Sequence, residues 1–442
     1  MDAKRRRRLG TVVGATVLLA ALAVPMSMPA SAAEVPDQVM AWNQHAYNEL
    51  IVTMAPPLNG PPAAAIHLAI VHGAIYDAVN AIDGGYEPYL GSPSAASTYS
   101  EDAAAATAGY RMLQYLLPSD RDDELLAYHE ASLAAILGAG VSQADVDGGI
   151  AVGEAAAAAM VTARTGDGRY GPPNTDPAYF FTEGTGAGDW RNLVAPLSPA
   201  GNNFKWVGDV KPFLIPSAAA FATPGPLSLT SAAYTAEFNQ VKSLGRVDSS
   251  TRTPDQTRMA HFWADHALAM WTRIFRQIAE KEDLSTTENA RYFAMLYLTG
   301  SDALIACFQD KERHSFWRPQ TAIQLAGIDG NSATVADGSW TSVLGNPPYS
   351  DHPSGHNCVS NSFVETLRDF FGTNQMAYSA TRATSPIGAI TRHFTRFSQA
   401  IREVRLARVY GGIHFMTADA QGATLGRKVA AWRQAHYFQP VA

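Results

Sequence analysis

Long runs with helical spacing of apolar residues constrain this chain more than any other feature. The stretch PPAAAIHLAIVHGAIYDAVNAI (residues 61–82) is mostly apolar, and its two prolines suit the first turn of a helix. Strand signals are sparse, so the sequence predicts an all-α protein built from two packed helix bundles. The other predicted helices cover residues 36–55, 101–117, 122–138, 143–165, 230–244, 254–281, 286–312, 355–371, 386–410 and 417–434.

The segment at residues 166–235 separates two helical blocks. It is rich in Gly, Pro, Asn and aromatic residues and has no sustained period. Its many aromatic side chains argue against disorder, so we expect a long ordered loop. We therefore predict an N-terminal helical block at 34–165, a loop-rich segment at 166–235 and a C-terminal helical block at 236–442.

The first 33 residues have the parts of a secretory signal. A basic start with four arginines is followed by an apolar stretch of about fifteen residues and a small-residue end, ASAA. Pro25 and Pro29 interrupt the apolar stretch, and no second hydrophobic span follows, which argues against a membrane anchor. We expect a signal peptide at about residues 1–33, through the general secretory or the twin-arginine route, and a secreted, extracellular protein.

The charge of the chain excludes some partners. Its net charge is −7, and it becomes −11 without residues 1–33, which carry five Lys or Arg and one Asp. An acidic surface argues against nucleic acid or an anionic membrane as partner. The two cysteines, Cys307 and Cys358, could form a disulfide or remain buried thiols. Zinc and calcium motifs are absent from the sequence.

Against this acidic background, the stretch KERHSFWRP (residues 311–319) concentrates cations. Lys311 and Arg318 are two helical turns apart. Pro319 disfavours helix at Arg318, so the helix should end near Ser315 and the two cations should lie on either side of its end. Cations at a helix C-terminus are ordinary partners of the helix dipole, and an anion site is the alternative.

A second stretch, YSDHPSGHNCVSNSFVETLRDFFG (residues 349–372), contains a predicted helix start. Ser354 and Gly355 fall at its N-terminus, where free N–H groups and a hydroxyl can bind an anion. His356 lies within one turn of that site. The simpler interpretation is a serine cap beside a surface histidine.

A third stretch, ARVYGGIHFMTADAQG (residues 407–422), carries Arg408 and His414, six residues apart. Gly411 and Gly412 should break the helix between them, so both side chains can turn to one point, and Asp419 follows on the next helix. A solvated arginine and a core histidine are the alternative. Together, the cations, hydroxyl, amide and two imidazoles of the three stretches suit a tetrahedral oxyanion. One imidazole could bond its central atom while the other moves protons.

These three motifs, K-x6-R-P, P-S-G-H and R-x5-H, occur in the order found in one superfamily. They resemble the vanadium-dependent haloperoxidases and the type-2 phosphatidic acid phosphatases, with the bacterial acid phosphatases. The stretches AIVHGAIYDAVNAI (69–82), SLGRVDSSTRTPDQTRMAHFWAD (243–265) and FWRPQTAI (316–323) are similar to the haloperoxidase branch. The resemblance covers most of the chain and implies an all-α fold with the anion pocket at one end of the bundles.

The resemblance also implies roles for individual residues. His414 would be the single protein ligand bonded to the metal of a vanadate cofactor, and His356 the acid–base residue. Asp265 would be the carboxylate that orients His356. The vanadate oxygens would be held by Lys311, Arg318, Ser354, Gly355 and Arg408.

The implied activity is that of a secreted haloperoxidase. It would oxidise halide with hydrogen peroxide to hypohalous acid, which then halogenates a small organic acceptor. The alternative is a secreted acid phosphatase with a phosphohistidine at His414, for which phosphate is a substrate analogue; in the haloperoxidase, phosphate would compete with vanadate. Ala407 stands where the phosphatase motif has serine, and Asp419 is one residue later than in that motif. A third hypothesis is an inactive relative that keeps an anion site.

Overall fold

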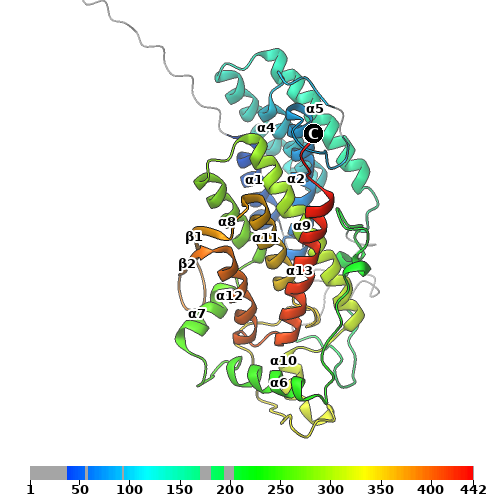
Figure 1. Ribbon diagram of the computed structural model, residues 1–442, viewed down its shortest axis with the longest axis vertical. Helices are drawn as coiled ribbons and strands as arrows, with labels where there is room; N and C mark the ends of the chain where they lie inside the picture. Colours follow the sequence, from blue (N-terminus) through cyan, green and yellow to red (C-terminus); the bar gives the residue numbers. More distant parts are fainter. Residues whose placement is uncertain (1–36, 55–57, 92–93, 170–180, 194–203, 442) are drawn as a thin grey trace, which may run out of the picture.

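The computed structural model describes residues 37–54, 58–91, 94–169, 181–193 and 204–441, and the predicted signal peptide lies outside them. Helices dominate these residues, which confirms the predicted fold class (Figure 1). The N-terminal helices are α1 (Gln38–Tyr47), α2 (Pro61–Asp83), α3 (Glu101–Leu116), α4 (Asp122–Gly138) and α5 (Gln143–Arg164). The later elements are α6 (Ala232–Leu244), α7 (Pro254–Phe262), α8 (Ala267–Lys281), α9 (Thr286–His314), α10 (Pro319–Gln324), α11 (Gly355–Phe371), β1 (Gln375–Arg382), β2 (Ile390–Arg396), α12 (Phe397–Tyr410) and α13 (Met416–His436).

Helix α9 runs through the middle of an elongated molecule, with α4 and α5 towards one end and α6 and α10 at the other (Figure 1). Its 29 residues start at a capping box in which Ser285 and Glu288 bond each other's backbone N–H groups. It packs against α2 of the N-terminal block and against α11 and α13 of the C-terminal block. One apolar core includes Ile75 of α2 and Phe363 of α11, so the two blocks share a single interior, and the domain boundaries remain a prediction.

The N-terminal block packs closely because small residues face each other. A Cβ added at Gly153 of α5 would lie 2.6 Å from the backbone oxygen of Ala104 in α3, so only glycine permits this approach. Helices α2 and α5 are long and apolar enough to cross a membrane by composition. The apolar window of α2 is 100% buried inside the protein, as expected of a core helix, and that of α5 is 33% buried.

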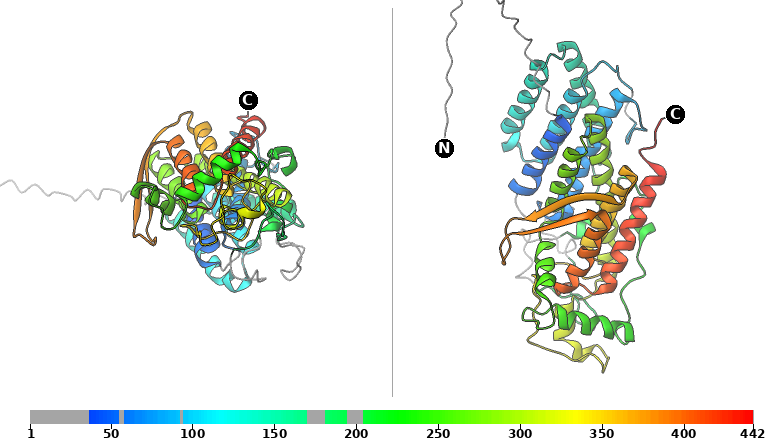
Figure 2. Two further views of the ribbon diagram at one scale, coloured as in Figure 1. Left: turned by 90° about the horizontal axis from the view of Figure 1, so that it is seen from below. Right: turned by 60° about the vertical axis from the view of Figure 1, so that its left-hand side comes forward.

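The helix predicted at 386–410 is wrong in its first half. Residues 390–396 form strand β2, which pairs antiparallel with β1, and α12 begins only at Phe397. Ile390 and Phe394 are four residues apart, a spacing that fits a helix face and also one face of a strand. The hairpin extends from the helical body beside α8 and α12 (Figure 2).

The helix predicted at 254–281 is interrupted. Helix α7 ends at Phe262 and α8 starts at Ala267, where His266 caps it by accepting the N–H of Ala269 at 3.1 Å. Asp265 accepts the N–H of His266 at 2.9 Å. These side chains offer the backbone an alternative to helical bonding, which ends one helix and begins the next.

The described parts of the loop-rich segment are ordered against the helices. Asp302, in the middle of α9, accepts the backbone N–H groups of three consecutive residues at 2.7, 2.6 and 2.8 Å: Phe213, Leu214 and Ile215. The described aromatic side chains of the segment are buried, which agrees with the predicted ordered loop; they are Phe181, Trp190, Phe204, Trp206, Phe213, Phe221 and Tyr234.

Candidate oxyanion-binding site

The two cations at the end of α9 lie side by side, as the spacing predicted. Lys311 is fully buried, and its Nζ donates to the backbone oxygens of Ser350 at 2.8 Å and Asp351 at 3.1 Å. Arg318, the N-cap residue of α10, donates to the backbone oxygens of Tyr349 at 2.8 Å, Ser350 at 3.3 Å and Ile413 at 2.7 Å. The cations therefore hold residues 349–351 next to the loop that precedes α13.

Burial lowers the pKa of both Lys311 and Arg318, but both stay positively charged at neutral pH. It lowers the pKa of Lys311 to about 8 and that of Arg318 to about 10. The two buried cations repel each other, and an anion between them would relieve that repulsion. Because the dielectric constant is low in a buried site, this attraction is stronger there than at the protein surface. The charge of this region favours an oxyanion.

The start of α11 forms a second part of the site. Ser354 is its buried N-cap residue, and its Oγ accepts the Nδ2–H of Asn357 at 3.2 Å. Gly355 is the first helical residue, so its N–H and those of the next two residues have no partner within the helix. The N-terminus of α11 thus presents free donors and the positive end of its dipole.

His356 points from this helix start into the site. Its Nε2 is buried and has no hydrogen-bond partner among the described residues. Burial, with help from Arg408, lowers the pKa of His356 well below its usual value. The imidazole is therefore neutral when no anion is bound, and an incoming negative charge would raise its proton affinity.

The third part of the site depends on the Gly-Gly pair that ends α12. Gly412 has φ 74°, and a Cβ there would lie 2.5 Å from the backbone oxygen of Gly245. Both the left-handed backbone and the close approach require glycine. The turn places His414, a buried residue, just before α13. The predicted helix break is confirmed.

His414 is held by a carboxylate that the sequence analysis missed. Its Nδ1 lies 2.8 Å from Oδ1 of Asp351, and its Nε2 lies 3.4 Å from an Nη1 of Arg318. Burial and the cations Arg318 and Lys311 lower the pKa of His414 well below its usual value. The neutral ring then donates Nδ1–H to Asp351, whose pKa burial raises to about 7. This tautomer leaves the lone pair on Nε2, where it accepts the Nη1–H of Arg318 and could instead bond an electrophile.

Arg408, in the last turn of α12, supplies the third cation. Its side chain is buried, and Nη1 donates to the backbone oxygen of Trp263 at 3.2 Å. Its Nε is buried without a partner among the described residues. The break between α7 and α8 therefore positions a carbonyl that orients this guanidinium and leaves other donors for a ligand.

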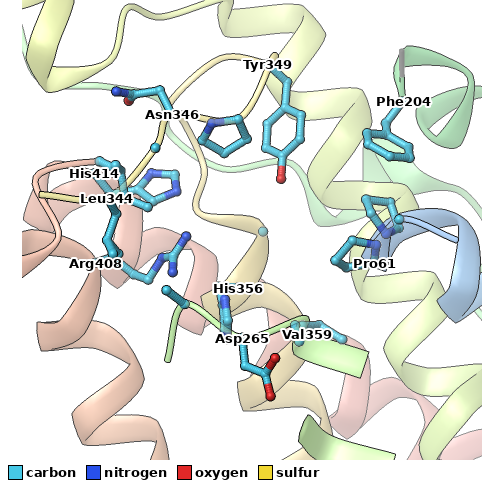
Figure 3. A pocket seen from close by; sticks show the side chains of 18 of the residues that line it. Pro61, Phe204, Asp265, Leu344, Asn346, Tyr349, His356, Val359, Arg408 and His414 are labelled. Carbon is cyan, nitrogen blue, oxygen red and sulfur yellow. The ribbon is translucent and has the colours of Figure 1, made fainter. Parts of the chain in front are cut away.

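The predicted pairing of Asp265 with His356 is not present among the described residues. Asp265 instead forms an ion pair with Arg273 at 2.5 Å, although it lines the same cavity (Figure 3). Asp419 accepts the Nδ2–H of Asn357 at 2.7 Å, so it supports the start of α11.

One cavity joins these parts. Its volume is about 670 Å³, and we call it the site cavity. In Figure 3, His414 and Arg408 lie on one side of it and His356 below them, whereas Phe204 and Pro61 lie on the opposite side. Of the eight predicted site residues, five line the cavity: Asp265, Gly355, His356, Arg408 and His414. The other three are buried behind its wall: Lys311, Arg318 and Ser354.

The described residues contain no cluster of three or more His, Cys, Asp or Glu that could hold a metal cation. Cys307 and Cys358 are buried free thiols, which answers the open question of their pairing in this structure.

Known proteins with similar sequences and structures were found over most of the chain. Residues 291–442 match the family described as the VCPO second helical-bundle domain. The vanadium chloroperoxidase of Curvularia inaequalis is 22% identical, over 86% of this chain and 78% of the relative.

Two solved structures share the fold. The structure of the first bacterial vanadium-dependent iodoperoxidase has a TM-score of 0.73 and 24% identity and covers 91% of this chain and 96% of that chain. The structure of a holo-type bacterial vanadium-dependent chloroperoxidase has a TM-score of 0.67 and 17% identity, and it covers 86% of this chain and 94% of that chain.

Proposed function

Because this chain is related to the vanadium haloperoxidases in sequence and fold, we propose that it oxidises halide with hydrogen peroxide, using vanadate as cofactor. The observation that carries the proposal is the convergence of three sequence motifs of the C-terminal block at one side of the site cavity. Residues of the second and third motifs line it, and Lys311 and Arg318 of the first are buried behind them. The product would be hypohalous acid, formed at that wall.

The donor set of the site fits a vanadate ion. The buried Nε of Arg408 and Nε2 of His356 lack partners among the described residues, and the first N–H groups of α11 have no partner within the helix. Arg408, Gly355, Ser354, Lys311 and Arg318 would hold its oxygens, and His414 would bond the metal through Nε2. When bound, vanadate supplies a Lewis-acidic centre that activates peroxide for attack by a halide.

The protein would contribute charge, position and protons. Lys311, Arg318 and Arg408 withdraw electron density from oxygens held between them, because they act in a buried environment. Asp351 keeps the Nδ1–H tautomer of His414, so that Nε2 stays a ligand. His356, neutral when no anion is bound, would take a proton from the incoming peroxide and return it to the leaving oxygen.

The test compares two reactions in one preparation. The purified protein is assayed with bromide, hydrogen peroxide and a dye acceptor, with and without vanadate, and separately with a phosphate ester. The proposal expects bromination that requires both vanadate and peroxide. Ester hydrolysis without vanadate, together with an acid-quenched phosphohistidine at His414, would instead establish the phosphatase. Neither reaction, with intact vanadate binding, would indicate an inactive relative.

We also propose that the protein is secreted, on the basic, apolar and small-residue parts of residues 1–33. Expression of the full chain should yield an extracellular protein whose N-terminus begins near residue 34. An intracellular protein that keeps its first residues would contradict this proposal.

A further inference from the structure

Two thiols meet where α9 packs against α11, outside the lining of the site cavity. Cys307 belongs to α9 and Cys358 to α11, and they are the only cysteines of the chain. Both side chains are completely buried, and the Cys358 thiol is within hydrogen-bond reach of Cys307. The fold therefore brings together two sulfurs that are far apart in the sequence.

The surroundings of the two thiols leave them free to approach each other. The Sγ of Cys307 lies 3.7 Å from the backbone oxygen of Pro353. A thiol is a weak donor, so this contact opposes only slightly a rotation of Cys307 towards Cys358. On the other side, a Cβ added at Gly422 of α13 would lie 3.3 Å from the Sγ of Cys358, so a side chain there would press on the sulfur.

Cys307 lies directly behind the wall of the site cavity. Gly355 lines the cavity, and a Cβ added there would lie 3.9 Å from the Sγ of Cys307. The other atoms near that point belong to Leu304 and Phe308, which line the cavity too. Because Gly355 has no side chain to cover the sulfur, a thin layer of atoms separates Cys307 from a small molecule in the cavity.

The charge near the pair favours its oxidation. Lys311 follows Cys307 by four residues, so the two lie one turn apart on the same face of α9. A cation beside a thiol favours the thiolate, the form that attacks an oxidant. Burial raises the pKa of Cys358 well above its usual value. Cys307 is therefore the thiol that attacks first, and Cys358 is the one that resolves the product.

We propose that Cys307 and Cys358 form an oxidation site for hydrogen peroxide, which converts the two thiols to a disulfide between α9 and α11. The structure shows the reduced form of this pair. The inference goes beyond the proposed function and does not depend on it, because peroxide alone is the oxidant.

The reaction balances without a further reagent. The Cys307 thiolate attacks one oxygen of the peroxide, the O–O bond breaks, and the other oxygen leaves as hydroxide, which takes up the proton of the thiol as water. The sulfenic acid on Cys307 is then attacked by the Sγ of Cys358. The S–S bond forms while the S–O bond breaks, and a second water molecule leaves. The two thiols lose two electrons, and the peroxide gains them.

The disulfide would close a loop that contains most of the anion site. Such a cross-link stabilises a protein mainly by restricting its unfolded chain. The oxidised protein should therefore unfold at a higher temperature, while the anion site keeps its geometry because α9 and α11 are already in contact. Of the eight predicted site residues, five lie between the two cysteines: Lys311, Arg318, Ser354, Gly355 and His356.

The first experiment counts thiols in the purified wild-type protein before and after incubation with hydrogen peroxide. Vanadate and halide are left out, so no hypohalous acid forms and the result is independent of the proposed function. The protein is then unfolded, labelled with N-ethylmaleimide and weighed by mass spectrometry. We expect both cysteines to be labelled before peroxide and neither after it, with a mass lower by two hydrogen atoms and one cross-linked peptide that contains Cys307 and Cys358. Thiols that stay reduced, or sulfinic acids without a cross-link, would overturn the inference.

The second experiment compares thermal unfolding of the oxidised and the reduced protein. We expect the Tm of the wild type to be about 5 °C higher after peroxide, and to return to its first value after treatment with a dithiol. Cys358→Ala is the matched control: it keeps every methionine of the chain, so it corrects for their oxidation, and its Tm should not rise. An equal Tm in both states of the wild type, or the same rise in Cys358→Ala, would overturn the stabilising cross-link.

Discussion

At the residue scale, the two nitrogens of His414 have different partners: Nδ1 bonds Asp351, and Nε2 lies 3.4 Å from Nη1 of Arg318. In His356, by contrast, Nε2 has no hydrogen-bond partner among the described residues. One histidine is fixed in its tautomer and the other is free to exchange a proton. The anchoring and proton-transfer roles can therefore be separated by mutation.

We predict that His356→Ala keeps most vanadate binding but loses halide oxidation by a factor of about 10² to 10⁴, because it removes proton transfer alone. His414→Ala should lose turnover completely and keep only weak electrostatic vanadate binding through the cations. Steady-state kinetics and vanadate titration by calorimetry distinguish them, with circular dichroism as the control of folding. Wild-type turnover in either variant would show that the roles are wrongly assigned.

Asp351 acts through His414 and is a positioning residue. Asp351→Asn should weaken vanadate binding by about 10- to 100-fold, the usual effect of losing such an outer partner. In a double-mutant cycle, the same change in the His414→Ala background should have almost no effect. A purely structural carboxylate would give equal losses in both backgrounds, and that result would contradict the positioning role.

At the element scale, the cations at and just after the end of α9 have different surroundings. Arg318 turns inward, whereas Arg313 is half exposed and pairs with Asp310 at 3.0 Å. Arg318→Ala should weaken vanadate binding at least tenfold, since a charge-assisted hydrogen bond contributes about 2 kcal/mol. Arg313→Ala should change it less than about twofold. Calorimetry measures the vanadate affinity of both variants. Similar losses of affinity in the two would contradict the anion site.

Helix α2 carries a histidine that belongs to the protein core and not to the anion site. His72 is fully buried and bonds Asn43 of α1 at 2.9 Å, and burial lowers its pKa to about 3. The unfolded state binds a proton below pH 6.5 that the folded state does not, so the free energy of unfolding falls as the pH falls from 6.5 towards 3.

Between pH 7 and pH 4.5, His72 should account for about 2.5 kcal/mol of lost stability. In His72→Gln the difference in unfolding free energy between these pH values should be smaller by that amount, measured with urea. His436→Gln, at the exposed end of α13, is the control and should keep the wild-type difference. An unchanged difference in His72→Gln would mean that the buried ring accepts a proton.

Local patterns predicted the helices and the three anion motifs, because spacing of three, four or seven residues is visible in one segment. They did not predict Asp351 as the partner of His414, since 63 residues separate the two and only the fold joins them. The hairpin was missed for another reason: Ile390 and Phe394 fit both a helix and a strand. Packing of β1 against α8 decided between them.

At the scale of the whole molecule, ligand binding should stabilise the fold. Vanadate at one hundred times its Kd should add about 2.7 kcal/mol to the free energy of unfolding. Phosphate should stabilise the protein too, but not on top of saturating vanadate, because both ions use the same cations. Thermal unfolding with each ion and with both tests this. Additive shifts would show two independent sites.

Asp302 fixes the loop-rich segment in place by accepting hydrogen bonds from three of its backbone amides. They tie the loop-rich segment to the middle of α9, the same helix that carries Lys311 near its end. Phe204 lies on the side of this attachment that reaches the cavity. Because three hydrogen bonds fix residues 213–215 to α9, a substitution at Phe204 should reshape the cavity without displacing the part of the loop that follows it.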